Sequence, residues 1–86
     1  MSAIPILRLG NVLLVNVNVE LDDEVASRMQ NDVLTAIERT EAHGVVVDIS
    51  GLEVVDSYVA RILAETGQMT RLMGTDAVVV GMRPEV

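Results

Sequence analysis

The sequence predicts an α/β domain with a mixed β-sheet flanked by helices, whose elements follow one another in the order ββαβαβ. Three observations support this fold class. In the segment 12–19, one set of alternate residues is entirely apolar (Leu13, Val15, Val17 and Val19) and the other set includes Asn16 and Asn18. This is the period-2 pattern of a half-buried strand. Two longer segments, which begin near Asp22 and at Ser57, carry apolar residues at helical spacing. Short apolar runs at 45–49 and 77–80 follow these segments, so crossover helices make part of the sheet parallel.

The first two strands are expected to form an antiparallel hairpin. Ile4–Leu9 is a short apolar run that Pro5 interrupts, and proline is tolerated at the edge of a sheet. Gly10-Asn11 is a turn signal, and Val12–Val19 continues as the second strand. The hairpin therefore places the first strand at an edge.

The first helix opens with three acids, Asp22, Asp23 and Glu24, where the helix dipole favours negative charge. Gly44 ends the connection to the next strand. The apolar stripe of this helix consists of Val25, Ala26, Met29, Val33, Leu34 and Ile37.

The second half of the chain predicts a strand, a helix and a strand. Val45–Ile49 is a nearly continuous apolar run, as expected for a central strand buried on both faces. A helix follows from Ser57 to about Leu72, Gly74 stops it, and Ala77–Val80 is expected to be another buried strand. The side chains of this helix expected to face inward are Val59, Ala60, Leu63, Thr66 and Met69 or Met73.

The chain of 86 residues is predicted to be one domain spanning 1–86. No helix that could cover the second face of the sheet precedes the last residue, so we expect a domain cut short at its C-terminus. Half of the residues are hydrophobic, and apolar surplus on a small domain usually lies in a subunit interface. We therefore expect a homo-oligomer, a dimer or larger, with Ile4–Leu9 and Val12–Val19 contributing to the contact.

Composition excludes several functions. The net charge is −7 and lysine is absent, so nucleic-acid backbones repel the chain. There is no cysteine, which excludes disulfides and thiolate chemistry. No segment approaches the roughly 20 apolar residues that span a bilayer, and the N-terminus lacks the features of a signal peptide. We expect a cytoplasmic protein that is not an enzyme, has no cofactor or metal, and does not bind membranes.

The segment around Ser57 is the candidate functional site. A serine at a helix start is either a helix cap or a place for a phosphate, because backbone N–H groups there favour negative charge. Asp56 is itself able to cap the helix, the residues 52–55 supply apolar anchors for the loop, and Tyr58 is expected at an exposed rim as a partner anchor. These features favour the phosphate.

Two other candidates have ordinary explanations. His43 is the only histidine and lies at the opposite end of its strand from Ser57, so a surface position near a helix end explains it. The acids Asp22, Asp23 and Glu24 are more typical of a solvated first turn than of a metal site.

The run from Asp48 to Arg61, DISGLEVVDSYVAR, resembles the signature of STAS domains, the family of anti-sigma-factor antagonists. Three further segments, 4–15, 20–23 and 79–84, are similar to the small single-domain scaffolds of bacterial stressosomes within that family. The resemblance covers the whole chain and implies a mixed sheet flanked by helices.

The resemblance also implies partners. Members of the family sequester a serine kinase of the RsbT type, assemble with RsbR-type STAS paralogues, and are phosphorylated on the serine that Ser57 matches. A dedicated phosphatase resets that site. By this resemblance the kinase docks on a surface that consists of Glu53, Asp56, Ser57, Tyr58 and Arg61.

Two alternatives stay open. One is a receiver-like phospho-aspartate domain, because Asp22, Asp23 and Asp48 follow strands as in an acidic pocket; it needs a lysine, which this chain lacks. The other is a purely structural oligomerisation module, in which Ser57 is only a helix cap.

Overall fold

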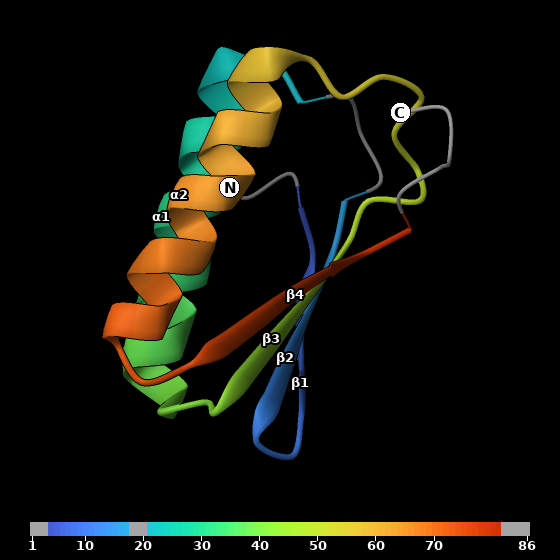
Figure 1. Ribbon diagram of the computed structural model, residues 1–86. Helices are drawn as coiled ribbons and strands as arrows, with labels where there is room; N and C mark the ends of the chain where they lie inside the picture. Colours follow the sequence, from blue (N-terminus) through green and yellow to red (C-terminus); the bar gives the residue numbers. More distant parts are fainter. Residues whose placement is uncertain (1–3, 18–20, 82–86) are drawn as a thin grey trace.

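The computed structural model describes residues 4–17 and 21–81, which form a four-stranded sheet with two helices against it (Figure 1). The predicted order ββαβαβ is confirmed. Residues 1–3, 18–20 and 82–86 lie outside the described residues, and so does Val19, the predicted end of the second strand. The elements are β1 (Ile6–Leu9), β2 (Val12–Asn16), α1 (Asp23–Thr40), β3 (Gly44–Asp48), α2 (Ser57–Leu72) and β4 (Asp76–Val80).

The strands lie in the order β1-β2-β3-β4. β1 and β2 form the predicted antiparallel hairpin, with Ile6 opposite Val15, and Gly10 turns it at a φ of 62°. β2, β3 and β4 are parallel, because α1 and α2 return the chain to the same end of the sheet each time. β1 is an edge strand, as Pro5 predicts.

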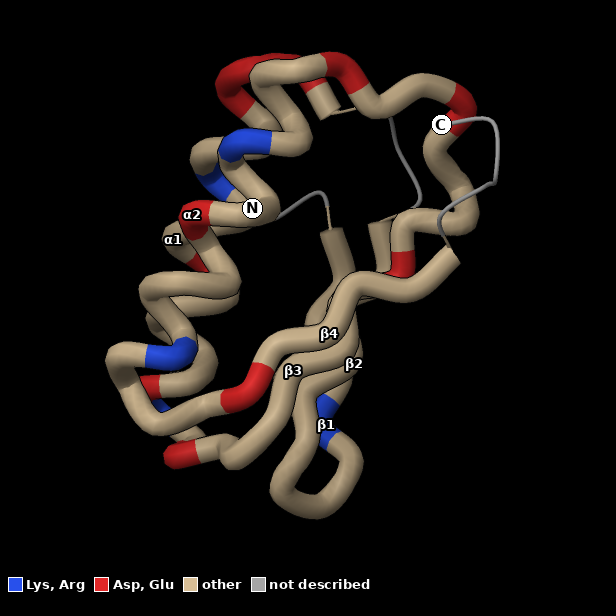
Figure 2. The backbone as a smooth tube through the Cα atoms, in the orientation of Figure 1, with Lys and Arg blue, Asp and Glu red and all other residues tan. Residues whose placement is uncertain are grey.

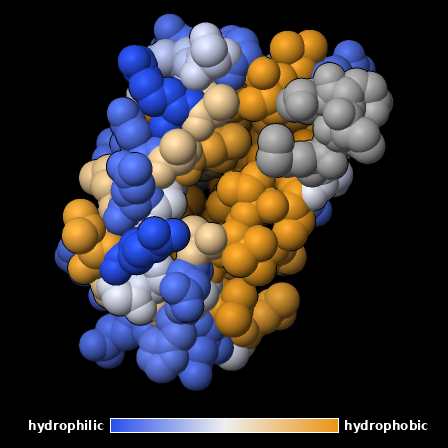
Figure 3. Space-filling model, viewed as in Figure 1, coloured by the Kyte–Doolittle hydropathy of each residue, from blue (hydrophilic) through white to orange (hydrophobic). Residues whose placement is uncertain are grey.

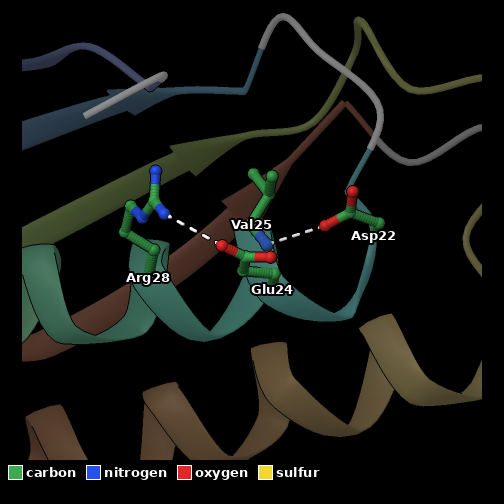
Figure 4. A network of polar contacts seen from close by, with 4 residues as sticks. All are labelled: Asp22, Glu24, Val25 and Arg28. Atoms are coloured by element: carbon green, nitrogen blue, oxygen red, sulfur yellow. Dashed lines mark hydrogen bonds and ion pairs between the residues drawn. The ribbon is translucent and has the colours of Figure 1, made fainter. Parts of the chain in front are cut away.

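The helix α1 begins as its acidic residues predict. The Asp22 carboxylate accepts a hydrogen bond of 2.8 Å from the Val25 N–H and caps the helix, and Glu24 pairs with Arg28 one turn later at 3.2 Å (Figure 4). Its buried residues are Ala26, Met29, Val33 and Ile37, which confirms the predicted stripe.

The helix α2 has the predicted bounds, and its buried face matches the prediction in part, because Val59 and Thr66 are buried and Leu63 packs half-buried against the core. Ala60 and Met69 are exposed, whereas Ile62 and Thr70 are buried together with Val59 and Thr66. The first turns of α2 are apolar on several sides, so helical spacing does not select one stripe. The neighbouring helix α1 and the sheet select it. The Thr66 and Thr70 hydroxyls donate to the carbonyls of Ile62 and Gly67, which satisfies both groups.

Both helices cover the same face of the sheet (Figure 1). The core lies between them and the strands, and its sheet side chains are Leu13, Val15, Val45 and Val47. The pairing register places four apolar residues side by side in a row across the other face: Leu7, Leu14, Val46 and Val78. We call these four residues the apolar row.

Two strand predictions are wrong in burial. Val46 of β3 is only half-buried, because the described helices cover one face of the sheet and not both. β4 is an edge strand rather than a buried one, and Val78 and Val80 are 54% and 39% exposed. A continuous apolar run in the sequence indicates a strand within a sheet, but it does not indicate how many faces of that sheet are covered.

Candidate functional site

The loop from β3 to α2 is held on the sheet by apolar side chains. Leu52 is only 3% exposed, its N–H donates to the Ile49 carbonyl at 2.9 Å, and Val55 packs against the core. Val54, by contrast, is 67% exposed. Two of the three apolar anchors predicted for this loop are therefore confirmed, and they bring the chain to the start of α2.

Asp56 and Ser57 have separate positions at that start. Asp56 is the N-cap, with extended backbone angles, and its carboxylate accepts a hydrogen bond of 2.8 Å from the Val59 N–H. Ser57 is the first residue of α2 and is exposed. Within the described residues its hydroxyl makes no hydrogen bond. The interpretation of Ser57 as the helix cap is wrong, because Asp56 already occupies that position.

Tyr58 does not stand free at a rim as predicted. It is half-buried and packs against the core, and its hydroxyl lies 3.4 Å from the Ser27 Oγ of α1. The guanidinium carbon of Arg61 lies 5.5 Å from the centre of the Tyr58 ring, which is a cation–π distance. Arg61 itself is exposed. One face of the only tyrosine is therefore covered by an arginine of the same chain.

Acidic residues lie where the two helices begin and in the loop before α2, and Figure 2 shows red segments at both places. Of the predicted site residues, Glu53 and Asp56 belong to this group and both are exposed. The members are Asp22, Asp23, Glu24, Glu53 and Asp56, and we call them the acidic end. All the predicted site residues lie in the β3–α2 loop or in the first two turns of α2.

Sequence reasoning missed an apolar groove lined by residues of the β3–α2 loop and of α2. It has a volume of about 180 Å³ and lies between α2 and the edge strand β4, where Figure 3 shows the surface hollowed. Its lining residues are Ile49, Val55, Ala60, Leu63, Ala64 and Val79. The signal was present in the sequence, since Ala60, Leu63 and Ala64 form a second apolar stripe at helical spacing.

The remaining candidates stay apart from this site. The Asp48 carboxylate accepts a 2.9 Å hydrogen bond from the Ser50 N–H, and hydrogen bonding from Ser50 holds the pKa of Asp48 below its ordinary value. The backbone N–H of His43 donates to the Asn11 carbonyl at the other end of β3, so His43 and Ser57 are not a catalytic pair. The described residues hold no group of three metal-ligating side chains.

Neither α1 nor α2 is long and apolar enough to cross a membrane, and these are the helices of the described segments.

Comparisons with known proteins identify the family. A STAS domain model matches residues 3–86. The RsbS protein of Moorella thermoacetica, solved with a glutamate in place of a serine, is 34% identical with a TM-score of 0.89; the match covers 99% of this chain and 72% of that chain. A chain from the molecular architecture of the stressosome, described as a signal integration and transduction hub, is 35% identical over 95% of this chain and 71% of that chain, with a TM-score of 0.82.

A curated relative agrees with this result. The RsbT co-antagonist protein RsbRA of Bacillus subtilis (strain 168) is 32% identical over 66 residues, which cover 77% of this chain. The chain spans about a quarter (24%) of the length of that relative. The family model and the fold agree with the resemblance carried by the segment from Asp48 to Arg61, and the chain belongs to the STAS domain family.

Proposed function

We propose that this chain is a non-enzymatic scaffold of a stressosome-type assembly, which binds a serine kinase of the RsbT type and releases it when Ser57 is phosphorylated. The observation that carries the proposal is that Asp56 and Ser57 have different roles at the start of α2. Asp56 caps the helix, so the Ser57 hydroxyl is exposed and not engaged by the described residues. A kinase can reach this hydroxyl without unfolding the helix.

The charge around Ser57 supports a release mechanism. A phosphoryl group adds about −1.5 to −2 charges at pH 7. Glu53 and Asp56 are exposed close to Ser57 in the sequence, and the chain already carries a net charge of −7. Charges separated by less than the Debye length of about 8 Å are poorly screened, so an acidic partner patch is repelled. Burying the phosphate against an apolar partner patch costs desolvation free energy. The surface changes its charge while the fold stays as it is.

The proposal includes three further partners. RsbR-type STAS paralogues and further copies of this chain share the assembly, and a phosphatase removes the phosphate from Ser57. The similarity to RsbS, to a stressosome chain and to RsbRA supports the STAS partners. The exposed apolar row supports assembly, because Leu7 and Val78 are 53% and 54% exposed.

Incubation of the chain with a kinase of the RsbT type and ATP, followed by mass spectrometry of its peptides, tests the modification. We expect one phosphate, at Ser57, and none in Ser57→Ala. Ser50→Ala is the matched control, since Ser50 is also exposed in the same loop. A phosphate on Ser50, or none at all, contradicts the proposal.

Calorimetric titration of the kinase tests the release. We expect Ser57→Ala to bind as the unmodified chain does. Ser57→Asp supplies one charge rather than two, so it should bind more weakly by up to a few kcal/mol, where ~1.4 kcal/mol corresponds to tenfold in affinity. Equal affinities for the unmodified chain and Ser57→Asp, together with no phosphate at Ser57, would contradict the proposal. The function would then be that of a structural oligomerisation module, which the apolar row supports.

A further inference from the structure

Arg61 lies in the second turn of α2, close to the acidic end, and has no carboxylate partner among the residues that the structure describes. The ion pair found among the described residues joins Arg28 to Glu24, and Arg61 instead lies 5.5 Å from the centre of the Tyr58 ring. Arg61 is exposed, so stacking on Tyr58 orders its side chain without burying its charge. The Arg61 guanidinium group can therefore move from the ring to another partner without breaking an ion pair.

Ser57 lies one helical turn before Arg61 on α2. Residues four apart on a helix are neighbours, with about 5–6 Å between their Cβ atoms. A phosphoserine has three strong acceptor oxygens, and the planar guanidinium group of arginine binds two such oxygens at once. Of the carboxylates close to Arg61 in the sequence, that of Asp56 already accepts the Val59 N–H.

We propose that Arg61 is the counter-ion of phosphorylated Ser57 within the same chain, and that phosphorylation moves the guanidinium group from the Tyr58 ring to the phosphate. This inference rests on the proposed function, because it assumes a phosphate at Ser57. It adds a second effect to the modification. The docking surface gains negative charge, and it also loses its exposed cation, because Arg61 is then paired internally.

The other charged groups near this position leave Arg61 as the available cation. Glu53 and Asp56 in the loop and Glu65, one turn after Arg61, are exposed acids that add to the negative potential around a phosphate. On α1 the neighbouring cation, Arg28, is already paired with Glu24. Arg61 is therefore the cation best placed to stabilise the dianionic form of the phosphate.

The test uses the full chain with phosphoserine incorporated at position 57 during translation, so no kinase is needed. A ³¹P NMR titration measures the second pKa of the phosphate, which is ~6 in the absence of partners. Arg61 should lower this pKa, so Arg61→Gln should raise it, which corresponds to a fall of about twofold or more in the acid dissociation constant. Arg71→Gln is the matched control, because it removes the same charge from the far end of the same helix.

The Tyr58 ring gives a second readout. Tyr58 is the only Tyr, Phe or Trp residue of the chain, so its ring resonances are unambiguous. In the unmodified chain, Arg61→Gln should shift these resonances. Phosphoserine at position 57 should move them in the same direction, because Arg61 leaves the ring.

Three results would overturn the inference: a phosphate pKa that Arg61→Gln leaves unchanged, an equal rise in Arg71→Gln, or ring resonances that do not respond to the phosphate. None of these depends on whether a kinase modifies Ser57. Conversely, a kinase that ignores Ser57 refutes the proposed function while the pairing of phosphate and Arg61 is still measured.

Discussion

Asp56 and Ser57 are adjacent residues with different roles at the start of α2. The Asp56 carboxylate satisfies the Val59 N–H at the start of α2, whereas the Ser57 hydroxyl is exposed and makes no bond within the described residues. Stability should therefore depend on the first residue, and modification on the second.

We expect Asp56→Ala to lower the free energy of unfolding by about 1 kcal/mol, because it leaves an N–H at the helix start without its acceptor. Ser57→Ala should change it by less than about 0.5 kcal/mol, as is usual for exposed positions without a structural role. Urea denaturation of both variants beside the unmodified chain measures the difference. A larger loss in Ser57→Ala than in Asp56→Ala would mean that the serine caps the helix in solution.

The Asp48 carboxylate should contribute to the pH dependence of stability. Hydrogen bonding from Ser50 lowers its pKa below the ordinary value of 3.8, so the folded state favours the ionised form. This contribution is fully present above pH 3.8 and is lost as the pH falls through the pKa of the folded state. The difference in unfolding free energy between the unmodified chain and Asp48→Asn should therefore shrink below pH 3.8. Urea denaturation from pH about 6 to about 2 measures it, and a constant difference contradicts the assignment.

At the scale of the secondary-structure elements, α2 contains a glycine that its conformation does not require. Gly67 lies inside the helix, and a Cβ atom added there meets no heavy atom within 4 Å. Glycine in a helix interior costs roughly 0.5–1 kcal/mol relative to alanine, mostly through the entropy of the unfolded chain.

Gly67→Ala should accordingly stabilise the domain by about 0.5–1 kcal/mol, seen as a higher denaturation midpoint. Gly81→Ala is the contrasting control. Its φ is +87°, and a Cβ atom there would lie 2.6 Å from the Ser50 backbone nitrogen, so this variant should be destabilised. Destabilisation by Gly67→Ala would show that α2 and its neighbours are packed more closely than the structure indicates.

At the scale of the whole molecule, one face of the sheet is covered by helices and the other presents the apolar row. Apolar residues that adjoin one another across four strands and are exposed or half-buried, as these are, are typical of an interaction surface, whereas single exposed ones are ordinary. β1 contributes Leu7 to this row and also exposes Leu9, 61% of which is accessible.

We therefore expect light scattering to find a dimer or larger species. The variants Leu7→Glu and Val78→Glu should reduce its mass, because each places a charge in the apolar row. Leu72→Glu is the control: Leu72 is 88% exposed but lies on α2, away from that face. A monomer at high micromolar concentration, or an equal effect of Leu72→Glu, would contradict association through this face.

Much of this fold was predictable from local signals in the sequence. Asp22 and Asp56 cap helices where acids precede helical periodicity, and the glycines at 10 and 74 adopt positive φ at the ends of elements. These signals depend only on a few neighbouring residues, so the order ββαβαβ and the bounds of α2 follow from the chain alone. The family signature around Ser57 is equally local.

Only the tertiary structure decided which sides of these elements are covered. α2 buries Ile62 and Thr70 rather than Ala60 and Met69, because its packing against α1 selects one of several apolar stripes. Tyr58 turns toward α1 for the same reason. Helical periodicity and residue type describe a single element, whereas burial depends on which neighbours that element meets, and those contacts arise between residues far apart in the sequence.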